Sequence, residues 1–146
     1  MPKSRTRIAS YRDLAAWQLA METVIEIYRV TRAFPAEEKF GLISQLRRAA
    51  VSIPSNIAEG KAVGGQSYPR HVRIALGSEA EIQTQIELAR RLGMLKASEA
   101  DKLVEDAADV SLGGTVADEE VLGDLAVRMT GDEQPQDLLF AWRENI

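Results

Sequence analysis

The chain has 146 residues, which is enough to bury a hydrophobic core within one domain. It contains no cysteine and a single histidine, His71, so disulfides, thiolate metal sites and cysteine nucleophiles are excluded. We therefore expect no catalytic residue, no metal and no cofactor. The sequence has neither a signal-peptide core nor a run of about 18 apolar residues, which predicts a cytoplasmic protein that does not enter a membrane.

The net charge of −4 is unevenly distributed along the chain. Residues 1–73 carry 12 Lys and Arg against 6 Asp and Glu, residues 74–110 carry 4 against 8, and residues 111–146 carry 2 against 8. Solvated helix faces, a nucleic-acid surface and self-complementary subunits are all compatible with a basic first half and an acidic tail.

The first half of the chain predicts two amphipathic helices. A capping box of Ser10 and Asp13 opens the first helix, which runs to about Arg32. Its predicted apolar stripe is Leu14, Trp17, Met21, Val24 and Tyr28. The second helix begins at Pro35 and ends at Gly60. Its predicted stripe is Leu42, Leu46, Ala49, Ile53 and Ile57.

Two further helices are predicted before the composition changes. The third runs from near Ser67 to about Leu92, with its stripe at Ala75, Ile82, Ile86 and Ala89. A capping box of Ser98 and Asp101 opens the fourth, a short helix with its apolar positions at Leu103, Val104, Ala107 and Val110. From Ser111 onward glycines and acids interrupt the period, leaving weak helical patterns at 117–129 and after Pro135.

These patterns predict an all-α fold. Because the connections are short, consecutive helices should be antiparallel neighbours. We expect an up-down-up-down four-helix bundle over residues 10–110, followed by an atypical acidic tail over residues 111–146.

A line of polar residues accompanies the apolar stripe of the second helix. On a helical wheel Gln45, Ser52, Asn56 and Glu59 fall along one edge of that stripe. We interpret them as a polar seam shared with a neighbouring helix, because buried polar groups need hydrogen-bond partners and so fix register. The alternative is an active-site cleft, but no nucleophile and base pair or metal trio accompanies these residues.

Pro54 lies inside the predicted second helix and should kink it. Proline removes one backbone hydrogen bond and crowds the carbonyl of Ala50. We expect one bent, continuous helix, with the hydroxyl groups of Ser52 or Ser55 satisfying the freed backbone groups.

The charged residues give candidate contacts but no catalytic arrangement. Arg47, Arg48, Arg70 and Arg73 are the candidates for contact with an anionic partner or with an acid on another subunit. Glu79 lies on the inner face of the third helix, where it either reaches a bundle edge or pairs with Arg47 or Arg48 across an interface.

Several strings in residues 10–110 resemble the four-helix-bundle proteins of the 23S rRNA intervening-sequence family. They are Asp13-Leu-Ala-Ala-Trp17-Gln, Phe34-Pro35 with Glu38, Gly41-Leu-Ile-Ser-Gln45-Leu-Arg47-Arg48-Ala49, Ser52-Ile-Pro-Ser-Asn56-Ile-Ala-Glu59-Gly60, and Ala75-Leu-Gly77-Ser78 with Glu81. The resemblance implies a homopentameric ring of bundles and no enzyme activity. A similar bundle is the accessory protein of diversity-generating retroelements, which binds reverse transcriptase and nucleic acid through a basic surface.

Two functions follow from the residues and the resemblance together. The first is a non-enzymatic homo-oligomeric scaffold, pentameric by resemblance, that acts by binding a partner. The alternative is an adaptor that binds RNA, DNA or a nucleic-acid-processing protein such as reverse transcriptase through a basic surface. The acidic tail departs from the family, whose fourth helix continues to a basic end, and it would repel phosphate.

Overall fold

The computed structural model describes residues 9–111, which contain four α-helices and no strand. The helices are α1 (Ala15–Thr31), α2 (Leu42–Val63), α3 (Tyr68–Arg91) and α4 (Ala97–Val110). Three 3-10 turns precede the first three of them, at Tyr11–Asp13, Ala36–Phe40 and Gly65–Ser67. The predicted all-α fold is confirmed.

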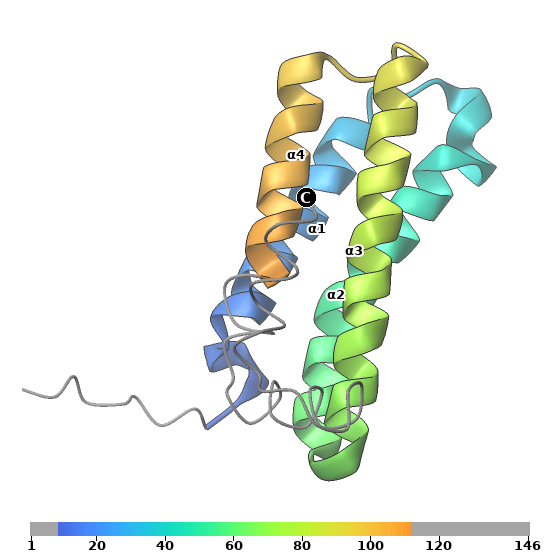
Figure 1. The fold of residues 1–146 in the computed structure, drawn as a ribbon. Coiled ribbons are helices and arrows are strands. Elements are labelled where there is room, and N and C mark those ends of the chain that lie inside the picture. The colour runs from blue at the N-terminus through green and yellow to red at the C-terminus, as the bar shows by residue number, and fades with distance from the viewer. Residues whose placement is uncertain (1–8, 112–146) are drawn as a thin grey trace, which may run out of the picture.

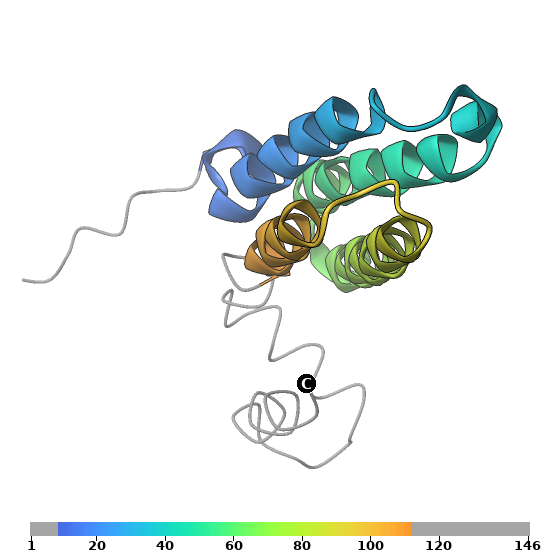
Figure 2. The ribbon, with the colours of Figure 1, turned by 90° about the horizontal axis from the view of Figure 1, so that it is seen from above.

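The four helices lie alongside one another around one core (Figures 1 and 2). Each helix contacts the next along the chain, and α4 returns to contact α1. Viewed from above, α1 and α2 form one layer and α3 and α4 the other (Figure 2). This is the antiparallel four-helix bundle that the short connections predict.

Four helix ends differ from the sequence-based predictions. The Ser10 capping box forms, with Asp13 Oδ2 accepting from Ser10 N at 2.9 Å, but it caps the 3-10 turn before α1. A second 3-10 turn occupies the residues after Pro35, so that α2 begins only at Leu42 and then continues past Gly60. At α4 the carboxylate of Glu99, not Asp101, accepts from the residue before the helix, because α4 begins two residues earlier than Ser98 predicts.

The predicted core stripes of α2 and α3 are confirmed, and that of α4 in three of its four positions. Their buried members are Leu42, Leu46, Ala49, Ile53 and Ile57 on α2, Ala75, Ile82, Ile86 and Ala89 on α3, and Leu103, Ala107 and Val110 on α4. Val104 is only partly buried and packs against this core.

The predicted stripe of α1 is wrong except at Leu14, which is buried in the core. Met21 and Tyr28 are 36% and 39% exposed, and Trp17 and Val24 are only partly buried. The face that α1 buries consists of Ala16, Ala20, Thr23, Ile27, Val30 and Thr31. Small Ala16 and Ala20 on this face let α1 approach its neighbours closely, whereas Met21, Ile25 and Tyr28 are turned toward the outside of the bundle.

Pro54 is buried inside α2, which continues through it without a break. Ser55 Oγ donates to the carbonyl of Val51 at 2.8 Å, one residue beyond the Ala50 carbonyl that proline deprives of its partner. The predicted continuous helix is confirmed, and the kink stays a prediction. The two weak helices predicted in the tail lie outside the described residues.

Candidate binding surfaces

A hydrogen-bonded polar cluster joins α2 to α3. It consists of Ser52, Asn56, His71 and Ser78. The hydroxyl oxygens of Ser52 and Ser78 lie 2.8 Å apart, and Asn56 Nδ2 is 3.2 Å from Ser52 Oγ. Asn56 Oδ1 and His71 Nδ1 are 3.1 Å apart. Since an amide oxygen only accepts, Nδ1 of His71 must carry the hydrogen.

The structure brings only two of the four predicted seam residues into this cluster. Gln45 is exposed, and its Oε1 accepts from Arg48 Nη2 at 2.9 Å. Glu59 is also exposed, with Oε2 3.6 Å from His71 Nδ1. In an antiparallel pair of helices, the sequence numbers of two contacting residues add up to a nearly constant value. This rule could have identified Ser78 and His71 as the partners of Ser52 and Asn56.

Gly60 allows α2 and α3 to approach closely beside the polar cluster. A Cβ atom at Gly60 would lie 2.7 Å from Tyr68 Cδ2 and 3.0 Å from His71 Cβ, both closer than carbon atoms normally approach. The polar cluster is therefore held between two closely packed helices. Its groups bond to one another, which suits a role in helix register and leaves no nucleophile directed toward solvent.

Glu79 lies inside the bundle, and its side chain contacts neither Arg47 nor Arg48 of the same chain. It is 8% exposed, its Oε2 accepts from Ser111 Oγ at the end of α4, and its Oε1 accepts from Gln83 Nε2 at 3.2 Å. Burial raises the pKa of Glu79 from its usual 4.5 to about 7. The residue therefore joins α3 to α4 inside one subunit.

A groove of about 530 Å³ lies on the outer side of α1, α2 and the 3-10 turn between them. We call it the basic groove, and its lining residues are Tyr28, Lys39, Phe40, Ile43, Ser44, Arg47, Arg48 and Val51. Three of these residues are cationic and none is acidic.

Two of the cations in the basic groove lie over aromatic rings. The guanidinium of Arg47 is 4.6 Å from the centroid of the Tyr28 ring, and its Nε donates to Thr31 Oγ1 at 2.9 Å. Lys39 Nζ lies 5.5 Å from the centroid of the Phe40 ring, which is 87% exposed. Such a surface offers both positive charge and a stacking platform to a ligand.

The other predicted arginines are elsewhere. Arg70 and Arg73 are exposed near the start of α3 and do not line the basic groove. The four candidate arginines are thus divided between two places, and sequence reasoning missed Lys39, Phe40 and Tyr28 as neighbours of Arg47. One observation could have placed all three near Arg47: the residues before α2 fold back beside the end of α1.

A second, mainly apolar groove of about 310 Å³ continues from the basic groove through Val51. Its lining residues are Tyr11, Trp17, Met21, Val24, Val51, Pro54, Ser55 and Ala58. Tyr11 and Trp17 meet edge to face here, with ring centroids 5.4 Å apart. This apolar groove exists because α1 turns its large side chains outward.

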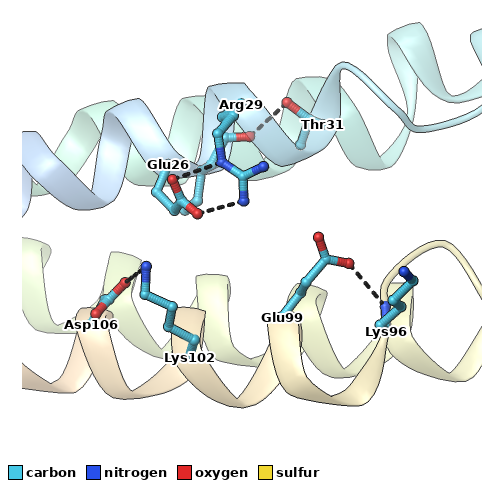
Figure 3. Close-up of polar contacts among 8 residues, drawn as sticks. Glu26, Arg29, Thr31, Lys96, Glu99, Lys102 and Asp106 are labelled. Atoms are coloured by element: carbon cyan, nitrogen blue, oxygen red, sulfur yellow. Dashed lines mark hydrogen bonds and ion pairs between the residues drawn. The ribbon is translucent and has the colours of Figure 1, made fainter.

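The opposite side of α1 is acidic. Figure 3 shows Glu26 and Arg29 on α1 facing Lys102 and Asp106 on α4. Arg29 holds the pKa of Glu26 below its usual value, through hydrogen bonds of 2.6 and 2.9 Å. This acidic groove of about 210 Å³ is lined by Leu19, Glu22, Thr23, Glu26, Lys102, Asp106 and Asp109.

An exposed flank of α3 carries apolar side chains. Ile74, Gly77, Glu81, Leu88 and Leu92 recur at helical intervals of three, four and seven, and all five are exposed. A Cβ atom at Gly77 would have nothing within 4 Å beyond its own helix backbone. We call these five residues the α3 flank.

Comparison of the sequence with known protein families is consistent with the four-helix bundle. The family model of the 23S rRNA-intervening sequence protein matches residues 12–112. The chain belongs to this family. No curated protein matches the sequence closely enough to add a function. Within residues 9–111, no helix is long and apolar enough to cross a membrane, and no group of three or more acidic or histidine residues is arranged to hold a metal.

Asn56→Leu tests the polar cluster. The substitution removes the Asn56 Oδ1 acceptor from His71 Nδ1 and the Asn56 Nδ2 donor from Ser52 Oγ, so we expect the free energy of unfolding to fall by about 1–3 kcal/mol. Urea denaturation measures this loss. Gln45→Leu, on the same helix but outside the cluster, is the matched control and should change stability by less than about 0.5 kcal/mol. Equal effects of the two substitutions would show that the cluster contributes no specific stability.

Glu79 should make the bundle less stable as the pH rises. Between about pH 4.5 and about pH 7 the folded protein keeps a proton on Glu79 that the unfolded chain has released. Its stabilising contribution is complete below pH 4.5 and is lost as the pH passes 7. Urea denaturation at acidic and alkaline pH should show a loss on the order of 3 kcal/mol from this group.

Glu79→Gln should remove this part of the pH dependence, because glutamine does not titrate. Glu105→Gln, which changes an exposed acid on α4 outside the α3 flank and the grooves, is the control and should leave it in place. If Glu79→Gln has the same pH profile as the unsubstituted protein, the pKa of Glu79 is not raised by burial and the prediction is contradicted.

Proposed function

We propose that this protein is a non-enzymatic scaffold that assembles with copies of itself and acts by binding a partner. Its family has no assigned enzyme activity, and the groups of the polar cluster are engaged in joining α2 to α3. Binding surfaces, in contrast, are plentiful on the outside of the bundle. The family resemblance makes five copies the expected number.

The α3 flank is the observation that supports self-assembly. Glycine inside a helix costs about 0.5–1 kcal/mol relative to alanine, yet no neighbouring atom within the described residues requires one at position 77. Exposed Ile74 and Leu88 lie on either side of it along the helix. A notch between apolar side chains is what a closely packed helix from a second molecule would need.

A ring requires two different contact surfaces on each subunit, because identical surfaces meeting each other give a closed dimer. The α3 flank and the apolar groove supply such a pair. They lie on different helices, and both expose hydrophobic side chains. Head-to-tail contact between them would let copies continue around an axis until the ring closes.

Leu88→Asp tests the assembly. We expect the full-length protein to be an oligomer whose mass falls to that of a monomer or small species in the variant, because the aspartate would be buried unpaired in the contact. Light scattering after size-exclusion chromatography measures the mass. Ile25→Asp is the matched control, since Ile25 is at least as exposed but lies outside the α3 flank and both grooves. A monomeric unsubstituted protein would refute the scaffold proposal.

The alternative function is a nucleic-acid adaptor, and the basic groove is the observation that favours it. Lys39, Arg47 and Arg48 can neutralise phosphates, while the exposed Phe40 ring can stack on a base. A protein partner that itself handles nucleic acid, such as a reverse transcriptase, would be held next to its substrate by the same surface.

Binding of single-stranded RNA at several salt concentrations tests this alternative. Arg48→Glu should lower the affinity at low salt by about tenfold or more and reduce the salt dependence. Arg73→Glu makes the same change of charge away from the groove, so it should have a much smaller effect. Absence of binding at low salt, or equal effects of both substitutions, would contradict the adaptor function.

A further inference from the structure

We propose that the acidic segment of residues 112–146 occupies the basic groove of its own chain. This inference depends on the groove and not on self-assembly, so either can fail without the other. It assigns to the tail the role of an internal competitor for any anionic partner.

The first argument is charge. The described residues that line the groove provide three cations and no acid. Residues 112–146 contain eight Asp and Glu against two Arg, the strongest excess of negative charge in the sequence. Opposite charges of this size attract over about 10 Å at ordinary ionic strength, and more strongly when salt is low.

The second argument is the apolar content of both partners. The groove exposes the rings of Tyr28 and Phe40 and the side chains of Ile43 and Val51. The tail contains Asp-Leu-Leu-Phe-Ala-Trp at residues 137–142, in which an acid precedes four large apolar residues. Electrostatic attraction alone would not require these apolar residues in the tail. A groove with aromatic side chains between its cations can bind them.

The third argument is reach. The tail leaves the bundle at Ser111, the end of α4. An extended chain spans about 3.3 Å per residue, so residues 112–146 can extend for about 100 Å, whereas a helix of the length of α3 is about 36 Å long. Any point on the bundle surface is therefore accessible to the tail.

Attachment to the same chain gives the tail an advantage over other occupants. A flexibly linked segment acts at an effective concentration of about 1 mM, which exceeds the free concentration of most macromolecules in solution. An RNA strand would have to displace the tail, and its phosphates would also be repelled by it. Only a strongly anionic ligand would therefore bind the groove tightly enough to displace the tail.

Cysteine cross-linking in the full chain tests this proposal directly, because the sequence contains no native cysteine. Ser44→Cys places a thiol in the groove, and Ala141→Cys places one in the tail. Under mild oxidation at low salt we expect the pair to form a disulfide within one chain, detected by mass and by a shift on a non-reducing gel. The rate should be independent of protein concentration and should fall severalfold in about 0.5 M salt.

Ser98→Cys with Ala141→Cys is the matched control. Ser98 is exposed at the start of α4, away from the groove, so this pair should form a disulfide at least tenfold more slowly. Adding Arg47→Glu and Arg48→Glu to the groove pair should slow it to the control rate. Equal rates in the groove pair and the control would overturn the proposal, and so would disulfides formed only between chains. Measuring the mass of the same samples shows separately whether the protein assembles.

Discussion

The close approach of α2 to α3 is the constraint on which the other features depend. Gly60 leaves room for Tyr68 and His71 at a distance that any larger residue would prevent. The polar cluster lies in this tight contact, and its bonds from Ser52 to Ser78 are made at only one register of the two helices. A slide of one helical turn would leave these polar groups unpaired, so the contact fixes both distance and register.

Fixing α2 against α3 also decides what α1 and α4 can do. With one side of α2 occupied by α3, α1 packs on another side of α2, and the small residues that it buries include Ala16, Ala20 and Thr23. Thr23 Oγ1 lies 3.4 Å from the Asp106 carbonyl oxygen, so Thr23 also brings α1 into contact with α4. Trp17, Met21 and Val24 are not on this buried face and line the apolar groove. The binding surfaces are thus a consequence of how tightly the core is closed.

The buried core was predicted best on helices in which the large residues and the hydrophobic residues lie on the same face. On α2 and α3 the large apolar residues recur with the helical period on one face, so the core followed directly from them. On α1 the period of large residues, from Trp17 to Tyr28, competes with a second period of small ones, and only the packing of neighbouring helices decides between them. Hydrophobicity alone cannot show that Trp17 is only partly buried whereas Ala16 and Ala20 are fully buried.

Prediction from the sequence was also incomplete for the polar residues, but for a different reason. The helical wheel correctly placed Ser52 and Asn56 beside the core, but it gave Gln45 and Glu59 the same status, since an edge position is half-buried only where a partner helix is near. Glu79 was correctly placed on the inner face of its helix. Its partner, Ser111, comes from the end of α4 in the same chain, and no local pattern in α3 could reveal it.

Charge is separated in three dimensions more sharply than along the sequence. The first half of the chain is basic overall, yet α1 contributes Glu22 and Glu26 to the acidic groove on one side and only Tyr28 to the basic groove on the other. A bundle with such a division attracts anions to one side and turns them away from the other. On the described surface, the basic groove offers an acidic tail three cations together with exposed aromatic side chains. The proposed contact gives the acidic composition of residues 112–146 a physical meaning, because the tail would then change the occupancy of the basic groove without altering any residue that lines it.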